Sequence, residues 1–125
     1  MKAFILYILL LVNAPMVAQN TFVYNYNTFL SGTKDQNIEE MEVNHHIYFI
    51  KFSSNDYGPD VTINDKIKLY MTSSVEYSNE YKCQEFSFVD DDGNTGMFCL
   101  YDVGSILIVF SNIDLVIIYE NRELN

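Results

Sequence analysis

The stretch that decides the fold is CQEFSFVDDDGNTGMFCLYDVGSILIVFSNIDLVIIY, residues 83–119. It holds four runs rich in Val, Ile, Phe and Tyr, separated by short groups of Asp, Gly, Asn and Ser. Links this short leave no room for a crossover helix, so consecutive runs must pair antiparallel. The sequence therefore predicts a four-stranded meander, with strands at Cys83–Val89, Met97–Tyr101, Ile106–Phe110 and Leu115–Tyr119.

The first link, DDDGN at residues 90–94, is a hairpin turn in which Gly93 supplies a positive φ. Its acids resemble those of a calcium loop, but an EF-hand register with Gly93 at position 6 puts Phe88 at position 1. Starting the register at Asp90 instead puts Thr95 at position 6. Neither register supplies the ligands, so the stretch is interpreted as a turn.

The length of that turn decides where the two cysteines of the chain lie. A two-residue loop puts Cys83 opposite Asp102 and Cys99 on the other face of the sheet. A three-residue loop puts Cys83 opposite Tyr101, with Cys99 diagonal on the same face and about 7–8 Å away. Bridged Cβ atoms lie about 3.8 Å apart, so a Cys83–Cys99 disulfide needs a bulge. Gly96 could provide that bulge, and both a disulfide and two separate buried thiols stay open.

Shorter strands precede the meander. Alternation predicts three sets of residues that each share one face of a strand: Phe22, Tyr24 and Tyr26; Tyr48, Ile50 and Phe52; Ile67, Leu69 and Met71. The last set is expected to point inward. Val61–Ile63 is a further short strand. Residues 34–44 form either a loop or a short helix capped by Thr33 or Asp35, and residues 72–80 form a loop.

Seven to eight short strands and at most one short helix define an all-β, mainly antiparallel fold, either a small up-and-down barrel or a sandwich. The run Ile106–Phe110 is apolar on both faces, which favours a central position. The run Leu115–Tyr119 is flat and apolar, and such a strand invites aggregation if it is left as an edge. We expect the N-terminal strand around Phe22–Tyr26 to cover it and close a barrel.

The N-terminus has the pattern of a secretory signal peptide. Lys2 precedes an apolar run, Phe4–Val12, that is far shorter than the ~20 residues of a membrane-spanning helix. Pro15 breaks a helix, and Ala18 is a small residue suited to the position before a cut. Residues 1–18 are therefore predicted to be cleaved, leaving a single β domain, 19–125, in a periplasmic or extracellular location.

Charge restricts the partners. Lys2 leaves with the signal, so 6 Lys and Arg remain against 17 Asp and Glu, a net charge of −11 for the mature chain. Such a surface repels nucleic acid and anionic lipid and keeps the chain dispersed. The expected partners are another protein or a small apolar or neutral ligand, and no membrane span is expected.

No motif predicts catalysis, a cofactor or a metal. His45 and His46 are adjacent, so on a strand they point to opposite faces and do not clamp one ion. Gly104-Ser105 lies in an ordinary turn and not in a nucleophile elbow. The sequence therefore favours a protein that is not an enzyme.

Tyrosine is the unusual feature, since the mature chain has nine Tyr and no Trp. Tyrosine combines a rigid apolar ring with a polar tip, as binding surfaces require. The candidate interaction residues are Tyr24, Tyr26, Tyr48, Tyr57 and Tyr70. The leading hypothesis is a secreted, non-enzymatic binding or interaction module. The alternatives are a small secreted hydrolase that uses acidic residues and a structural, envelope-associated protein.

Overall fold

The computed structural model describes residues 21–53 and 58–123, through which nine antiparallel strands run. They are β1 (Thr21–Gly32), β2 (Glu42–Ser53), β3 (Val61–Ile63), β4 (Ile67–Met71), β5 (Glu76–Ser78), β6 (Cys83–Asp90), β7 (Thr95–Tyr101), β8 (Ile106–Phe110) and β9 (Val116–Glu120). Within these ranges, the only helical element is one turn of 3-10 helix, η2 (Ile38–Glu40). The described residues contain no helix that is long and apolar enough to cross a membrane. The predicted signal peptide lies outside the described residues.

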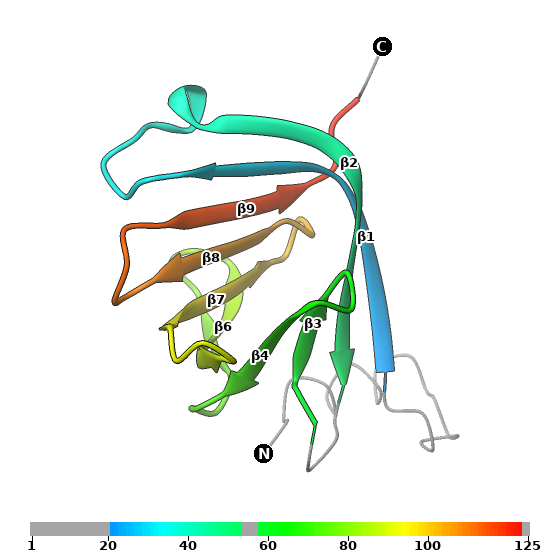
Figure 1. Cartoon of the computed structure of the whole chain (residues 1–125), viewed down its shortest axis with the longest axis vertical. Helices are drawn as coiled ribbons and strands as arrows, with labels where there is room; N and C mark the ends of the chain where they lie inside the picture. Colours follow the sequence, from blue (N-terminus) through cyan, green and yellow to red (C-terminus); the bar gives the residue numbers. More distant parts are fainter. Residues whose placement is uncertain (1–20, 54–57, 124–125) are drawn as a thin grey trace.

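Eight of the strands close into a barrel (Figure 1). The sheet runs β4-β3-β2-β1-β9-β8-β7-β6-β5, and β4 also pairs with β6, which completes the ring. The short strand β5 lies outside the ring, paired with the first residues of β6. The predicted small antiparallel barrel is confirmed, and the alternative prediction, a sandwich, is not observed in the described residues.

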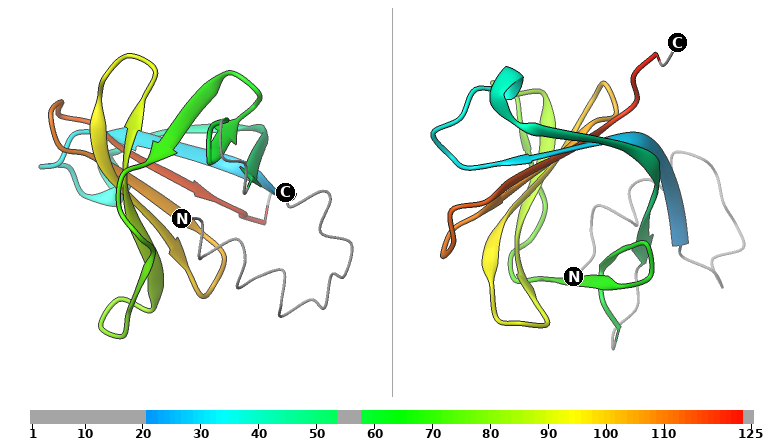
Figure 2. Two further views of the ribbon diagram at one scale, coloured as in Figure 1. Left: turned by 90° about the horizontal axis from the view of Figure 1, so that it is seen from below. Right: turned by 45° about the horizontal axis from the view of Figure 1, so that its top comes forward.

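Strand β1 covers β9, as expected from the apolar character of the last strand. The pairing uses the end of β1, with Thr28 opposite Glu120 and Gly32 opposite Val116. The predicted contact through Phe22–Tyr26 is therefore wrong in position, since that part of β1 pairs with β2. Both β1 and β2 are long enough to bend sharply and to serve two parts of the barrel wall (Figure 2).

The bend lies at an irregularity in the β1–β2 register, where Tyr26 pairs with Tyr48 but Thr28 pairs with His45. Such a bulge re-aims the side chains that follow it. Before it, Phe22, Tyr24 and Tyr26 pack toward the main core. After it, Phe29 packs on that core while Leu30 joins a second cluster. Alternation continued from Tyr26 would instead put Leu30, and not Phe29, on the face of the main core.

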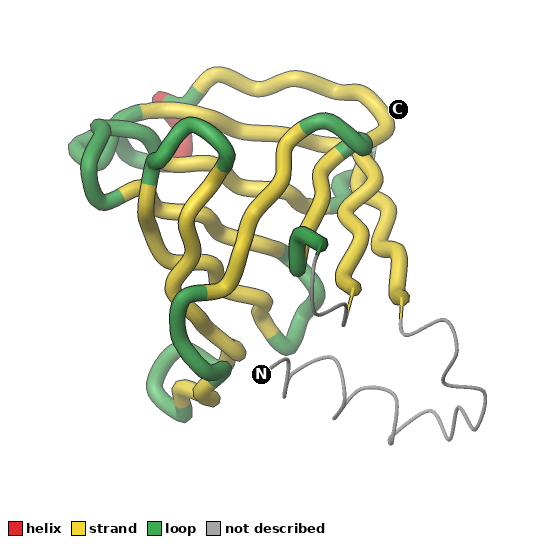
Figure 3. Tube along the Cα trace, turned by 60° about the horizontal axis from the view of Figure 1, so that its bottom comes forward, coloured by secondary structure: helices red, strands yellow, loops and turns green. Residues whose placement is uncertain are grey.

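Aromatic rings fill the middle of the barrel, which the strands surround in Figure 3. Phe98 of β7 is fully buried, with its ring centroid 4.8 Å from that of Phe86 and 5.7 Å from that of Phe52. On the neighbouring strand, Ile106, Ile108 and Phe110 face the same core. The interior is thus a packed hydrophobic core that stabilises the sheet.

The second cluster lies outside the barrel wall. Leu107 and Val109 of β8 and Ile118 of β9 pack there against Leu30, Met41 and Val116. This explains why β8 and β9 are apolar on both faces: one face lines the barrel and the other lies under the chain between β1 and β2.

Three local expectations need correction. The helical turn follows Asn37, whose N–H is bound by Glu40 Oε1 at 2.9 Å, and not Thr33 or Asp35. Residues 76–78 form β5 where a loop was predicted, because three residues carry no detectable alternation. Ile67 is 46% exposed at the tip of the β3–β4 hairpin, beyond the core that Leu69 enters.

Candidate functional site

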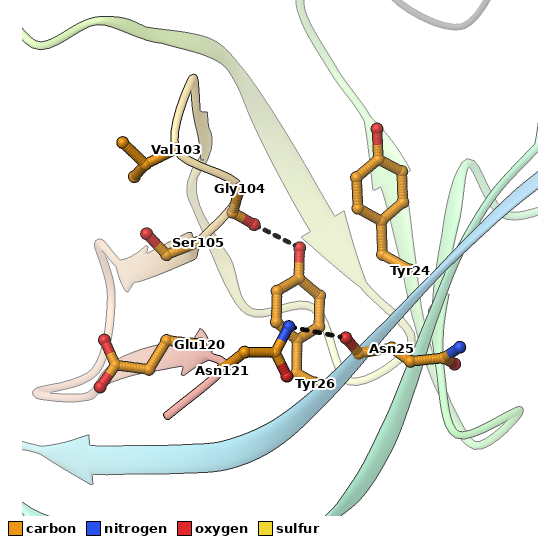
Figure 4. Close-up of a pocket in the computed structure, with 8 residues that line it drawn as sticks. All are labelled: Tyr24, Asn25, Tyr26, Val103, Gly104, Ser105, Glu120 and Asn121. Atoms are coloured by element: carbon orange, nitrogen blue, oxygen red, sulfur yellow. Dashed lines mark hydrogen bonds between the residues drawn. The ribbon is translucent and has the colours of Figure 1, made fainter. Parts of the chain in front are cut away.

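A pocket opens where β1 separates from β9. Towards its N-terminus β1 leaves β9 behind at Thr28 and continues beside β2. The turn between β7 and β8 faces the gap. We call the resulting cavity of about 380 Å³ the barrel-end pocket; it is lined by Tyr24, Asn25, Tyr26, Val103, Gly104, Ser105, Glu120 and Asn121 (Figure 4).

Two hydrogen bonds hold the barrel-end pocket in shape. Tyr26 Oη donates to the carbonyl of Gly104 at 2.6 Å and so ties β1 to the β7–β8 turn. Gly104 has φ +102°, a conformation in which glycine is favoured. On the other side, Asn121 Nδ2 donates to the carbonyl of Asn25 at 3.1 Å. Both bonds are drawn in Figure 4.

The walls of this pocket combine aromatic and polar groups. The rings of Tyr24 and Tyr26 lie 6.5 Å apart and nearly parallel. Burial raises the pKa of Tyr26, and Tyr24 adds to the shift, so the Tyr26 phenol stays neutral. Ser105, Asn121 and the carboxylate of Glu120, which pairs with Arg122, supply polar groups.

Replacing Tyr26 with Phe is expected to lower the free energy of unfolding by about 1 kcal/mol at neutral pH, because the Gly104 carbonyl loses its donor. The raised pKa of Tyr26 adds a pH dependence with a definite sign. The unfolded tyrosine releases its proton at about pH 10 while the folded one keeps it, so this residue destabilises the native state as pH rises further. Urea unfolding of both proteins at neutral pH and above pH ~10 should show the difference shrinking.

The control for this prediction is Tyr81→Phe, at a tyrosine that is 60% exposed. It should leave stability unchanged at both pH values. Equal losses for Tyr26→Phe and Tyr81→Phe would show that the bond to Gly104 does not hold the pocket.

A second cavity, of about 390 Å³, lies on the outer face of the barrel, and we call it the outer groove. Its floor is the exterior of β8 and β9, and the chain between β1 and β2 forms its other wall. The aliphatic and methionine residues that line it are Ile38, Met41, Ile106, Leu107, Val109, Val116 and Ile118. Lys34 and Tyr101 also line it, and the backbone N–H of Lys34 is fixed to Asp114 Oδ1 at 2.9 Å.

The two cavities share two lining residues. Ser105 and Glu120 line both the barrel-end pocket and the outer groove. Ser105 immediately precedes β8, and Glu120 is the last residue of β9. A polar recess and an apolar groove therefore share a border.

The structure separates the tyrosines singled out from the sequence. Tyr24 and Tyr26 come together in the barrel-end pocket. Tyr48 packs inside, against Phe29 and Tyr119. Tyr70 lies on β4, where a hydrogen bond to Asp91 raises the pKa of the phenol. Tyr57 lies outside the described residues.

The positions of the two cysteines match the register of the three-residue turn. Cys83 is opposite Tyr101 and Glu85 is opposite Cys99, so Cys83 and Cys99 are diagonal on the outer face of β6–β7. Both are free and buried. The pairing passes regularly through Gly96, opposite Phe88, so the suggested bulge is absent there. Burial, helped by Cys83 and Glu85, raises the pKa of Cys99 to about 12, which keeps the thiol protonated and a poor nucleophile.

The acidic turn is explained by its own hydrogen bonds. Asp90 Oδ1 accepts hydrogen bonds from the backbone N–H groups of Asp92 and Asn94 at 2.9 and 2.8 Å.

The two histidines contact different partners. His45 Nδ1 lies 3.2 Å from Thr28 Oγ1, while the His46 ring packs edge-to-face against Tyr48.

The fold and its two adjoining cavities define the class as a small antiparallel β-barrel with a solvent-accessible recess at one end. Comparison with protein families, curated proteins and solved structures gave no significant match.

The outer groove was not predicted from the sequence, although one feature of the sequence indicated it. Leu107 and Val109 make β8 apolar on both faces, which indicates apolar surface on the exterior as well as in the core.

Proposed function

We propose that the mature chain is an exported, non-enzymatic binding module for a small amphipathic molecule. The apolar part of the ligand occupies the outer groove, and its polar head reaches the barrel-end pocket. Export rests on the sequence of residues 1–18, and an intact mass beginning at Gln19 in the protein secreted by its host tests it.

The observation that carries this proposal is the shared border of the two cavities at Ser105 and Glu120. Ligand sites are concave and mostly apolar, with a few polar groups that fix orientation, and volumes start at about 300 Å³. The outer groove supplies the apolar surface. The barrel-end pocket supplies hydroxyl, amide and carbonyl groups beside it.

The barrel interior supports this choice of location. Phe52, Phe88 and Phe98 are at most 1% exposed, so their rings occupy the space that an enclosed apolar ligand would need. An apolar ligand is therefore better accommodated in the outer groove, on the other face of the same strands.

Electrostatics favours a neutral or cationic head. Glu120 lies at the border of the cavities, and the mature chain carries a net charge of −11. Among the described residues, the one cation that lines the outer groove is Lys34, at the end away from Glu120, and its backbone N–H donates to Asp114 Oδ1. Arg122 pairs with the Glu120 carboxylate, so the repulsion that an anionic head would meet comes mainly from the net negative charge of the whole surface.

The test is calorimetric titration with three probes that share one chain: octyl glucoside, octyltrimethylammonium and octyl sulfate, each below its micelle concentration. The neutral and cationic probes are expected to bind at one site per chain, and octyl sulfate at least about tenfold more weakly. In Glu120→Gln the preference against the sulfate should shrink. Equal binding of all three probes, or none, would refute the proposal.

A matched pair of variants locates the site. Val109→Asn places an amide in the outer groove and should lower the affinity for octyl glucoside by about tenfold, or ~1.4 kcal/mol. Val23→Asn makes the same change on β1, where Val23 is 51% exposed and away from both cavities, and should leave affinity unchanged. A thermal unfolding curve of each variant shows whether the fold is retained.

A further inference from the structure

We propose that Cys83, Glu85 and Cys99 form a binding site for a zinc-class divalent cation on the outer face of β6 and β7. The site is separate from the amphiphile site, since none of the three residues lines either cavity. Within the described part of the chain, these residues bring two sulfur donors and one carboxylate oxygen to within 4.8 Å of one another.

The hairpin register brings the three donors together. The three-residue turn puts Glu85 opposite Cys99, and period-two alternation puts Cys83 on the same face two residues earlier. A donor pair at i and i+2 on one strand is thus completed by a donor from the next strand. The frame is rigid, because β6 is paired with β7 on one side and with β5 on the other.

The distances suit a tetrahedral ion. Zinc binds thiolate at about 2.3 Å and carboxylate oxygen at about 2.0–2.2 Å, so its ligand atoms stand about 3.5–3.8 Å apart. Cys83 Sγ lies 3.9 Å from Glu85 Oε2, and the whole set spans at most 4.8 Å. Shifts of about an ångström, within the reach of side-chain rotation, complete the geometry.

The chemistry points to a borderline-soft cation. Two cysteine sulfurs, each of which releases its proton to solvent as the metal binds, and a carboxylate match zinc, whereas magnesium and calcium select oxygen donors alone. The sulfurs are shielded, with Cys83 1% and Cys99 8% exposed. The anionic Asp102 carboxylate adds to the field at Cys83, and the neighbouring cation Lys82 is exposed to solvent. Three protein donors leave one position for water.

The same sulfurs could instead form the disulfide considered from the sequence. A disulfide holds its Cβ atoms at about 3.8 Å, the spacing of directly opposite residues, whereas these cysteines are diagonal. The two thiols contact each other through a hydrogen bond, and a metal ion would hold both sulfurs without a covalent bond between them. It would also use Glu85, for which a disulfide has no role. The geometry therefore favours the metal.

The experiment is a titration of the reduced, metal-free mature chain with Co²⁺ and then Zn²⁺ under inert gas. We expect one Co²⁺ per chain, with the intense visible bands of tetrahedral cobalt and a sulfur-to-metal charge-transfer band. Zn²⁺ should then displace Co²⁺, because zinc binds thiolate sites more tightly. Absence of these bands at saturating Co²⁺, or a native protein whose two sulfurs are bridged, would overturn the proposal.

Variants separate this site from adventitious binding to an acidic surface. Cys99→Ser should abolish the charge-transfer band, and Glu85→Gln should keep it while lowering affinity at least about tenfold. The matched control is Glu76→Gln, because Glu76 is exposed and lies opposite Glu85 on β5 but outside the cluster. An equal loss of Co²⁺ affinity in the two glutamate variants would mean that the ion is attracted only by the negative surface charge. Circular dichroism of each apo variant confirms that the barrel is folded.

Discussion

Replacing Phe98 with alanine is expected to lower the free energy of unfolding by about 3–5 kcal/mol. Phe98 is fully buried at the middle of β7, and its ring stacks on Phe86 and meets Phe52 edge-on. Phe86 belongs to β6, which is next to β7, whereas Phe52 belongs to β2, on the opposite wall of the barrel. Alanine would therefore leave a cavity between the two walls, which the ring-to-ring contacts now span.

The measurement is urea unfolding followed by circular dichroism, with the slope of the transition compared between proteins. A domain of this size is stable by about 5–15 kcal/mol, so Phe98→Ala should leave a marginal native state. The control is Phe49→Ala, because Phe49 is 50% exposed on the outer face of β2 and should cost well under 1 kcal/mol. Similar losses for both variants would contradict a core that depends on Phe98.

The meander could be predicted from the sequence because its information is local. The turn at residues 90–94 fixes the register of β6 and β7, and alternation then assigns each side chain to a face. Of the two registers considered, the three-residue loop is the one observed, with Cys83 opposite Tyr101. Strand pairing, the inward phenylalanines and the barrel class all follow from such local rules.

The closure of the barrel depends on contacts that local rules do not reach. The covering of β9 by the N-terminal strand was predicted, but the segment used is Thr28–Gly32. The bulge beside Asn27 decides this, since it turns β1 away from β9. Asn27 then binds the chain after β9, with its N–H donated to Asn121 Oδ1 at 2.9 Å. A single asparagine in a strand gives no sign of a partner 94 residues away.

Part of the candidate site could also be predicted from local alternation along a strand. Tyr24 and Tyr26 share a face by alternation, so their meeting in one pocket follows from the sequence. The outer groove needs the chain around Ile38 to lie against β8 and β9, a tertiary contact that its polar composition does not indicate. The Cys83–Glu85–Cys99 cluster lay within reach, since the three-residue turn already implies it.

Gly96→Ala is the second substitution with a large expected effect, a loss of about 3 kcal/mol in the free energy of unfolding from one added methyl group. Gly96 of β7 is opposite Phe88 on one side and Phe110 on the other, and these two rings meet edge-on 5.4 Å apart. A methyl group at Gly96 would stand 2.9 Å from the Phe88 ring and 2.9 Å from Phe110 Cα, and closer still to the Val109 carbonyl. The glycine is needed for space, because the backbone of β8 cannot yield without breaking its pairing.

Urea unfolding of Gly96→Ala and of Gly104→Ala separates this cause from the conformational freedom of glycine. A methyl group at Gly104 would meet nothing within 4 Å, so its cost is the strain at φ +102°, about 1–2 kcal/mol. The double variant Phe88→Leu with Gly96→Ala removes the ring but leaves the β8 backbone in place. If the backbone contact dominates, the smaller side chain restores little stability. Full recovery in the double variant would instead assign the cost to the Phe88 ring and would contradict the close approach of β7 and β8 as its cause.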